Sequence, residues 1–251
     1  MSLQMSIFSE LNTNVSAECV LFGFDFNELK VLLVEKTLKP KKKPEITYNY
    51  LPFDQIRNIE SLDESAQRII LDLIGLKDIE VKQFFCFGQT NRTKNEIDVD
   101  LLKSLQYQPD DRIISVGFFS LVNQDALALE KETQYYKIKW CSINDLPQLA
   151  FDHKEIITKA LASLYYNVKF LGTGLELLPA KFTLTQVQKL YEVLLNRPMD
   201  KRNFRRKILA SGLFRKLAIK EKGVSHKPAK YFQLNKEKFQ KLKTGEIEII
   251  F

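Results

Sequence analysis

The sequence predicts an α+β protein of two domains, with strands and helices mixed over residues 1–170 and a winged helix-turn-helix over residues 171–251. Two features of the first part support this fold class. Short β-branched and aromatic runs are typical of strands, and two capping boxes mark helix starts. In the second part, an amphipathic helix, a tight turn, a basic helix and a β-hairpin follow one another, which is the order of a winged helix.

The composition is that of a globular protein. With 251 residues and 45% hydrophobic content, the chain can build the cores of one large or two modest domains. No apolar run approaches the roughly 20 residues that cross a bilayer, and the N-terminus lacks the features of a signal peptide. Cys19, Cys86 and Cys141 are scattered without a C-x-x-C pair, so we expect buried reduced thiols in a cytoplasmic protein without a membrane partner.

The charge is concentrated in the last third of the chain. Residues 171–251 hold 18 Lys and Arg against 7 Asp and Glu, whereas residues 1–170 hold 20 against 24. The net charge of the two parts is therefore +11 and −4, which gives the total of +7. A domain-sized concentration of positive charge indicates binding to a polyanion through phosphate contacts.

The basic segment 198–210, PMDKRNFRRKILA, is predicted to form a short helix with Asp200 as its N-cap. Phe204 and Ile208 lie one turn apart and should be buried. The opposite, exposed face then carries Arg202, Asn203 and Arg206. Such side chains bind base edges and phosphates, so we predict that this helix binds double-stranded DNA. A solvated basic face explains the isolated run equally well.

The flanking segments favour DNA binding. Residues 181–197 form an amphipathic helix whose apolar stripe is Leu184, Val187, Leu190, Tyr191 and Leu194. Residues 211–223 and 225–234 read as two strands joined at a tip, a wing that contacts the DNA backbone while the basic helix enters the major groove. The predicted DNA contacts are Lys201, Arg202, Asn203, Arg205, Arg206, Lys207, Lys227 and Lys230, with Lys220, Lys222 and His226 as further phosphate contacts of the wing.

In the N-terminal part, residues 60–76 have the signals of a capped helix. Ser61 and Glu64 make a capping box, and Gly75 follows the last turn. The apolar stripe is Leu62, Ala66, Ile69, Ile70 and Leu73. A hairpin over residues 19–36, strands within 81–88, 111–122 and 135–147, and a helix within 150–170 that starts at an Asp152–Glu155 capping box complete the domain. A polar insertion at 90–111 contains a short helix.

The helix at 60–76 resembles that of the Nudix box, G-x5-E-x7-R-E-U-x-E-E-x-G-U. Glu60, Arg68 and the pair Gly75-Leu76 stand at their family positions, and Asp54 replaces the opening glycine. In Nudix hydrolases the glutamates of the box hold divalent cations that activate water.

Two of these glutamates are missing here. Ile69 and Leu73 replace metal-binding glutamates, and Asp72 replaces a third. Because Mg²⁺ needs several oxygen ligands, we predict no catalytic residues, no metal, no other cofactor and no enzyme activity.

Residues 176–214, together with AFDHKEI at 150–156, resemble the Nudix-related transcriptional regulators of the NrtR and AraR type. The sequence departs from the family at 51–56, where LPFDQI replaces LPGGFV. The resemblance implies a Nudix-like α/β/α sandwich before the winged helix. It also implies a homodimeric bacterial repressor that binds operator DNA and senses L-arabinose or an ADP-ribose-like nucleotide.

If the resemblance holds, Arg68, Asp72 and Arg112 flank the remnant Nudix cleft and are the predicted effector contacts. We expect His153 to be structural or to line a pocket, because no nucleophile or acid accompanies it in a catalytic pattern. Two alternatives remain: a hydrolase with a metal site rebuilt from Glu60, Asp72 and acids of 96–111, and a nonspecific nucleic-acid-binding module.

Overall fold

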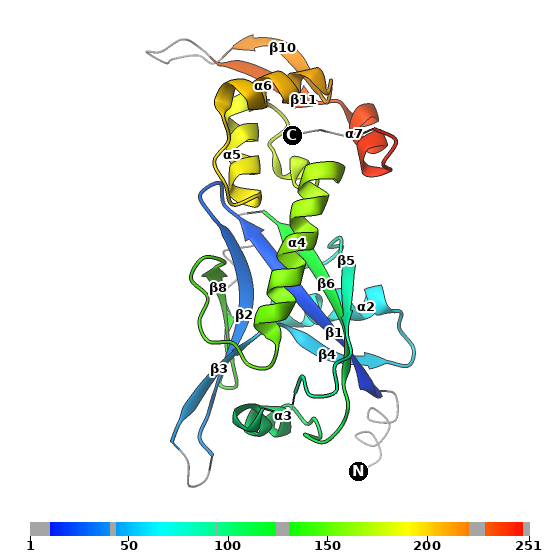
Figure 1. Ribbon diagram of the computed structural model, residues 1–251, viewed down its shortest axis with the longest axis vertical. Coiled ribbons are helices and arrows are strands. Elements are labelled where there is room, and N and C mark those ends of the chain that lie inside the picture. Colours follow the sequence, from blue (N-terminus) through cyan, green and yellow to red (C-terminus); the bar gives the residue numbers. More distant parts are fainter. Residues whose placement is uncertain (1–10, 41–43, 94, 124–130, 221–228, 248–251) are drawn as a thin grey trace. The chain divides into compact units, whose positions relative to one another are not determined.

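The computed structural model describes residues 11–40, 44–93, 95–123, 131–220 and 229–247 (Figure 1). Its contacts divide the chain into two compact units: unit 1 holds the described residues up to Gly23 together with Lys30–Leu161, and unit 2 holds Phe24–Leu29 and the residues from Ala162 onward. The boundary that we placed after residue 170 stays a prediction. No helix in the described part of the chain is long and apolar enough to span a bilayer.

One mixed sheet organises unit 1. Its described strands are β1 (Leu11–Phe24), β2 (Leu29–Leu38), β3 (Ile46–Tyr50), β4 (Phe53–Arg57), β5 (Lys82–Phe87), β6 (Ile114–Val122), β7 (Lys131–Glu132) and β8 (Lys137–Ser142). They run in the order β5-β6-β1-β2-β8-β7, with β3 on β2 and β4 on β1. β1 and β6 are parallel, whereas the pairs β1–β4, β2–β8 and β5–β6 are antiparallel.

Helices cover both faces of this sheet. Because side chains alternate along a strand, Ala17, Cys19 and Leu21 of β1 share one face, and they join a core with Ile69 and Ile70 of α2 (Leu62–Ile74). Glu18 of β1 points to the other face, where its carboxylate meets the imidazole of His153 at the start of α4 (His153–Leu171). The sheet of unit 1 therefore lies between α2 and the start of α4 (Figure 1).

Local sequence determines α2 almost completely. The Ser61–Glu64 capping box is present, and Gly75 ends the helix with φ of 74°. The burial of Ala66, Ile69 and Ile70 confirms most of the predicted stripe. Leu62 is an exception, because it lies in the first turn and its side chain is 38% exposed.

The side-chain contacts predicted for the Asp152–Glu155 capping box of α4 are wrong. The carboxylate of Asp152 accepts hydrogen bonds from Nε and NH2 of Arg92, both at 2.8 Å. The N–H groups of Glu155 and Ile156 instead donate hydrogen bonds to the backbone carbonyl of Asp152 in the first turn of the helix. Arg92, which is distant in sequence, binds the Asp152 carboxylate, because a bidentate ion pair is stronger than a hydrogen bond to one backbone N–H.

The segment predicted as a polar insertion is anchored by buried side chains. It contains the 3₁₀ turn η1 (Glu96–Asp98) and the predicted short helix, α3 (Val99–Ser104). Leu101 and Leu102 are buried. Asp98 is also buried, where its carboxylate accepts a hydrogen bond from the N–H of Phe151 at 2.9 Å, and burial raises the pKa of Asp98.

The cysteine prediction is only partly correct. Cys19, Cys86 and Cys141 are free thiols, as predicted. Cys19 is buried in the core beneath α2, but Cys86 is exposed and Cys141 is half-buried. The last two lie on β5 and β8, near the two ends of the sheet.

Unit 2 contains the predicted helix-turn-helix and wing. Its elements after α4 are η3 (Leu175–Leu177), β9 (Phe182–Thr183), α5 (Leu184–Leu194), α6 (Lys201–Ala210), β10 (Phe214–Lys220), β11 (Lys230–Leu234) and α7 (Lys236–Lys243). β9, which we did not predict, pairs with β11, so the hairpin belongs to a three-stranded sheet in the order β10-β11-β9. α7 was not predicted either. The core includes Phe182, Leu190, Tyr191 and Phe232.

Candidate functional site

The turn between α5 and α6 is held by side chains. The Glu192 carboxylate accepts hydrogen bonds from the Met199 N–H at 3.0 Å and from Nε2 of Gln188 at 2.9 Å. Gln188 also donates to the Met199 carbonyl at 3.2 Å. Asp200 then caps α6, because its Oδ1 accepts from the Asn203 N–H at 2.7 Å, as the sequence predicts. These contacts fix where α6 begins.

One side of α6 is packed into the domain. Phe204 and Ile208 are 3% and 0% exposed, which confirms the predicted buried face. The Phe204 ring lies 5.6 Å from the ring of Tyr191 on α5. Burial raises the pKa of Tyr191, so its phenol stays neutral in this core. The aromatic contact holds α6 against α5 and turns the other side of α6 to solvent.

The exposed side of α6 carries the predicted reading residues. Arg202, Asn203 and Arg206 are all exposed, as is Lys201 at the helix start. NH2 of Arg206 donates to Oδ1 of Asn203 at 2.8 Å, so the two side chains hold each other before any ligand binds. Guanidinium and amide groups can form paired hydrogen bonds with base edges in a major groove.

Arg205 and Lys207 flank this face and are half-buried. NH2 of Arg205 donates to the Thr185 hydroxyl on α5 at 3.2 Å, so this guanidinium is held against α5. A guanidinium held against α5 is less free to reach a base edge. Arg205 therefore suits a phosphate contact beside the reading residues.

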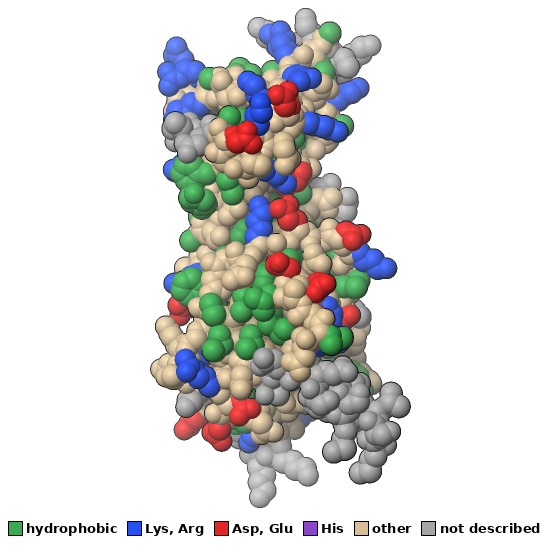
Figure 2. Space-filling model, turned by 90° about the vertical axis from the view of Figure 1, so that its right-hand side faces the viewer, with side chains coloured by type: hydrophobic (Ala, Val, Ile, Leu, Met, Phe, Trp, Pro, Cys, Tyr) green, Lys and Arg blue, Asp and Glu red, His purple; other side chains and the backbone are tan. Residues whose placement is uncertain are grey.

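The wing is only partly described. β10 and β11 pair antiparallel from Phe214–Leu234 to Lys220–Lys230, and Lys230 is exposed. The predicted contacts Lys222, His226 and Lys227 lie outside the described residues, as does the side chain of Lys220. Figure 2 shows Lys and Arg side chains gathered at the upper end of the view. In unit 2, the exposed basic residues include Lys201, Arg202, Arg206, Arg215, Lys216, Lys230, Lys236, Lys238 and Lys241.

A pocket in unit 1 is the second candidate site, and we call it the α2 pocket. It has a volume of about 270 Å³, at the lower end of pockets that hold small molecules. It brings together residues from β2, β3, β4, α2 and the segment after α3. The lining residues are Val34, Lys36, Tyr50, Pro52, Phe53, Asp54, Arg68, Ile69, Asp72, Leu73, Leu105, Tyr107 and Tyr136.

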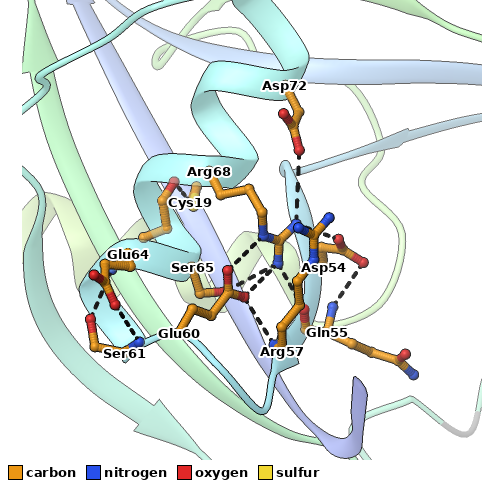
Figure 3. A network of polar contacts seen from close by, with 11 residues as sticks. Cys19, Asp54, Gln55, Arg57, Glu60, Ser61, Glu64, Ser65, Arg68 and Asp72 are labelled. Atoms are coloured by element: carbon orange, nitrogen blue, oxygen red, sulfur yellow. Dashed lines mark hydrogen bonds and ion pairs between the residues drawn. The ribbon is translucent and has the colours of Figure 1, made fainter. Parts of the chain in front are cut away.

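Arg68 is the centre of a polar network beside this pocket (Figure 3). Its Nε and NH2 donate to the two Glu60 oxygens at 2.8 Å, and its NH1 donates to Asp54 at 2.8 Å. NH2 also donates to the Gln55 carbonyl, and Asp72 lies 4.0 Å away. The hydrogen bonds that Arg68 donates to Glu60 raise the pKa of Arg68. This guanidinium holds β4 to α2 and has few donors left for a ligand.

The same contacts determine whether a divalent cation fits. Glu60 is bound to Arg68 and accepts a further hydrogen bond from the Arg57 N–H at 2.9 Å. Ile69 and Leu73 offer no oxygen ligand, which leaves Asp72 as the one acidic group on that face of α2. The described residues contain no group of three or more potential metal ligands. The cation site of the Nudix box, and the rebuilt site considered as an alternative, do not fit these residues.

The structure brings together two of the three predicted effector contacts. Arg68 and Asp72 line the α2 pocket, whereas Arg112 does not. NH2 of Arg112 donates to the Gly88 carbonyl at 3.0 Å on the exposed surface. The sequence did not indicate Lys36 or Tyr107, which enter the pocket from a strand and from the predicted insertion.

The Glu60–Arg68 pair leads to a prediction about acid stability. Burial raises the pKa of Glu60, but the hydrogen bonds from Arg68 and the Arg57 N–H lower it below its usual 4.5. A carboxylate with a lowered pKa stabilises the fold above its unfolded-state pKa, and this contribution is lost as the pH falls through the folded-state value. We expect Arg68→Met to have a lower free energy of unfolding than wild type at pH 7. The difference between the two free energies should become smaller below about pH 4.5. Urea unfolding at several pH values measures this. Arg57→Met, which leaves the pair intact, should show no such convergence.

Sequence reasoning missed a buried ionic cluster around Arg92. Besides the two bonds to Asp152, NH1 of Arg92 donates to the Ser115 hydroxyl at 2.5 Å, and NH2 lies 3.7 Å from Glu18. Ser115 donates to Glu18 at 2.9 Å. Burial alone lowers the pKa of Arg92, but the charges of Glu18 and Asp152 raise it above its usual value. The cluster links β1, β6, the 90–111 segment and the start of α4.

His153 belongs to this cluster, which confirms its predicted structural or pocket-lining role. It is 1% exposed, and its Nδ1 accepts a hydrogen bond from the Leu51 N–H at 2.9 Å. Its Nε2 lies 3.4 Å from Glu18. With Glu18 and Arg92 it lines a cavity of about 10 Å³, no larger than one water.

Comparisons with known proteins found one family match and one similar curated protein. Residues 174–234 match the family of NrtR DNA-binding winged helix domains. A protein of Acinetobacter baylyi, described as the ADPR responsive transcriptional repressor NtrR, is 25% identical over 203 residues, which cover 79% of this chain and 73% of that protein.

Solved structures share the fold. Shewanella oneidensis NrtR in complex with a 27mer DNA has a TM-score of 0.66 at 23% identity, covering 90% of this chain and 95% of that chain. A MutT/nudix family protein from Enterococcus faecalis has a TM-score of 0.62 at 19% identity, covering 88% and 86%. The predicted architecture, a Nudix-like domain followed by a C-terminal winged helix, is confirmed.

Proposed function

We propose that this chain, a Nudix-related regulator with an NrtR-type winged helix over residues 174–234, is a ligand-responsive transcriptional repressor. The winged helix binds operator DNA, and the α2 pocket holds an effector that changes the affinity for the operator. We expect it to act in the bacterial cytoplasm, where operator DNA is found.

The main observation that supports the proposal is the structure of α6. A capped helix packs Phe204 and Ile208 inward and presents Arg202, Asn203 and Arg206 outward, inside the segment that matches a DNA-binding family. A merely solvated basic face requires none of these features. In the proposed mechanism, Arg202, Asn203 and Arg206 read bases, and Lys201, Arg205, Lys207, Lys227 and Lys230 neutralise phosphates.

A homodimer follows from the way in which such helices read DNA. Two copies related by a two-fold axis place their α6 helices in major grooves about 34–36 Å apart, or a multiple of that distance, so the operator should be nearly palindromic. Two reading helices double the base contacts, which is how a small domain reaches high specificity.

ADP-ribose is the first effector to test, because the Acinetobacter relative is described as responsive to it. L-arabinose is the alternative that the wider resemblance suggests. Either ligand can regulate only to the extent that it binds one conformation of the protein better than the other, a coupling that is typically about 1–3 kcal/mol.

Hydrolysis is the less well supported function. The chain has the fold of MutT/nudix family proteins. At the α2 positions where the Nudix box has its glutamates, however, only Asp72 is acidic, and Glu60 is held by Arg68. Metal-assisted attack on a diphosphate depends on the charge of a bound cation. Regulation without turnover is therefore the function that we propose.

One experiment tests the proposal. Duplexes selected from a random library by the full-length chain are titrated in fluorescence anisotropy beside scrambled versions, with and without ADP-ribose or L-arabinose. We expect specific binding at least about 10³-fold tighter than nonspecific binding, weakening with salt, and a roughly 5- to 150-fold change with the effector. Equal affinity for scrambled duplexes, or turnover of ADP-ribose with Mg²⁺ or Mn²⁺, contradicts the proposal.

Arg206→Ala should weaken binding to the selected duplex by about 1–3 kcal/mol and relax the preference at one base position. The reason is that Arg206, held by Asn203, is poised to form a forked hydrogen bond with a base. Lys201→Ala removes the same charge from the same helix, but should weaken all duplexes alike. Titrations against single-base operator variants separate the two effects. An Arg206→Ala chain that discriminates every position as wild type does removes Arg206 from the reading residues.

A further inference from the structure

We propose that Lys36 binds the phosphate of the effector, and that the α2 pocket therefore selects a phosphorylated sugar or nucleotide over a free sugar. The inference rests on the proposed function, because it takes the α2 pocket to be the effector site. Arg68 and Arg112 are the cationic effector contacts predicted from the sequence, and the inference adds a different cation, Lys36.

The first step concerns the charge around Arg68. Three carboxylates surround its guanidinium: Asp54 and Glu60 at 2.8 Å and Asp72 at 4.0 Å. One positive charge is thus outweighed by three negative charges on the α2 side of the pocket. A phosphate placed there meets net repulsion, since Arg68 has little remaining capacity to compensate.

Lys36 is another cation that lines the α2 pocket. It lies on β2, is half-buried, and donates one hydrogen bond from Nζ to the Ser104 carbonyl at 3.3 Å. No carboxylate of the described residues pairs with it. An ammonium group has three donors, so two remain for a ligand. Burial lowers the pKa of Lys36, and a bound anion would restore the stability of its charged form.

Tyr107 supplies a second donor among the lining residues of the α2 pocket. Tyr107 lines the pocket, is 7% exposed, and has a buried hydroxyl without a hydrogen-bond partner among the described residues. Burial raises its pKa, so the phenol keeps its proton. A buried donor without a partner is costly, and a ligand oxygen is a suitable acceptor. The α2 pocket therefore offers two donors to a phosphate, the ammonium of Lys36 and the hydroxyl of Tyr107.

The remaining polar groups suit hydroxyls. The side chains of Asp54 and Asp72 are 47% and 62% exposed. Each carboxylate oxygen can accept more than one hydrogen bond, so both groups can accept from sugar hydroxyls. The rings of Tyr50 and Tyr136 also line the pocket and supply apolar surface. A ligand that carries both hydroxyls and a phosphate matches these lining groups better than a neutral sugar does.

The test measures ADP-ribose binding to the full-length chain by isothermal titration calorimetry. Lys36→Gln should weaken binding about ten- to hundredfold, because a hydrogen bond to a charged group is lost. Lys36→Arg should restore most of the affinity. Lys39→Gln is the matched control: it removes the same charge three residues away, where Lys39 pairs with Glu45 and is 78% exposed. Tyr107→Phe should weaken ADP-ribose binding by a smaller factor than Lys36→Gln does.

A second titration separates phosphate recognition from general damage to the pocket. Wild type should bind ribose 5-phosphate more tightly than ribose, and Lys36→Gln should reduce this ratio rather than weaken both sugars equally. An unchanged ratio, or equal binding of ADP-ribose by wild type and Lys36→Gln, overturns the inference while the proposed function stands. A chain that binds its operator but none of the phosphorylated probes also overturns it. A chain that binds ADP-ribose but no specific duplex contradicts the proposed function alone.

Discussion

Arg92→Ala is expected to lower the free energy of unfolding of the Nudix-like domain by about 3–5 kcal/mol, the usual cost of removing one partner from a buried ion pair. The Arg92 side chain is 3% exposed, and its loss leaves the carboxylates of Glu18 and Asp152 without their cation. The Ser115 hydroxyl loses its donor as well. Neither carboxylate can reach water easily, so little of the cost is recovered.

Denaturant unfolding followed through Trp140 measures this effect. Trp140 is the single tryptophan of the chain and packs against the core beneath α2, so its fluorescence reports on this domain. Arg112→Ala is the control, because Arg112 follows the same segment but is exposed, and exposed substitutions usually change stability by less than about 0.5 kcal/mol. If Arg92→Ala unfolded at the wild-type denaturant concentration, the cluster would not be a stabilising element.

The cluster was not predictable from sequence because its members are far apart in the chain. Arg92 lies 60 residues from Asp152, and Ser115 lies 97 residues from Glu18. The segment around Arg92 has few apolar residues, so its pattern is typical of a solvated loop. Only the folded sheet shows that the polar side chains point inward and satisfy one another.

Features set by local spacing were predicted well. The capping box of α2, the αL glycine at its end and the Asp200 cap of α6 each depend on residues within one turn of each other. The same local rule gave the wrong contacts at Asp152, where a distant arginine competes for the carboxylate. A capping pattern therefore predicts a helix start more reliably than it predicts the partners of the side chain.

The two candidate sites also differ in how much of each could be predicted from local spacing. The exposed face of α6 comes from one continuous segment, so helical periodicity was sufficient to identify Arg202, Asn203 and Arg206 as neighbours. The α2 pocket draws on three strands, one helix and the segment after α3. Resemblance to the Nudix box led to Arg68 and Asp72, but Lys36 and Tyr107 have no motif and emerge only from the three-dimensional arrangement.

Phe204→Ala is the second substitution with a large expected effect, about 3–5 kcal/mol, because it removes an aromatic side chain that is 3% exposed and leaves a cavity beside Tyr191. The loss falls on the contact that holds α6 against α5. DNA binding should therefore weaken although no DNA-facing side chain is changed. Leu209→Ala is the matched control: it also truncates a large apolar residue on α6, but Leu209 is 47% exposed.

Hydrogen-exchange mass spectrometry locates the damage. In Phe204→Ala, peptides covering α5 and α6 should exchange faster, because opening of this unit costs less free energy, whereas peptides from β1 and β6 should exchange at wild-type rates. Leu209→Ala should resemble wild type in both regions. Faster exchange over the whole chain would mean that the Phe204 contact supports one cooperative fold, and unchanged exchange in α6 would mean that this aromatic contact does not hold the reading helix. Weaker operator binding together with faster exchange confined to α5 and α6 would show that the buried face of the helix determines how well its exposed face can read DNA.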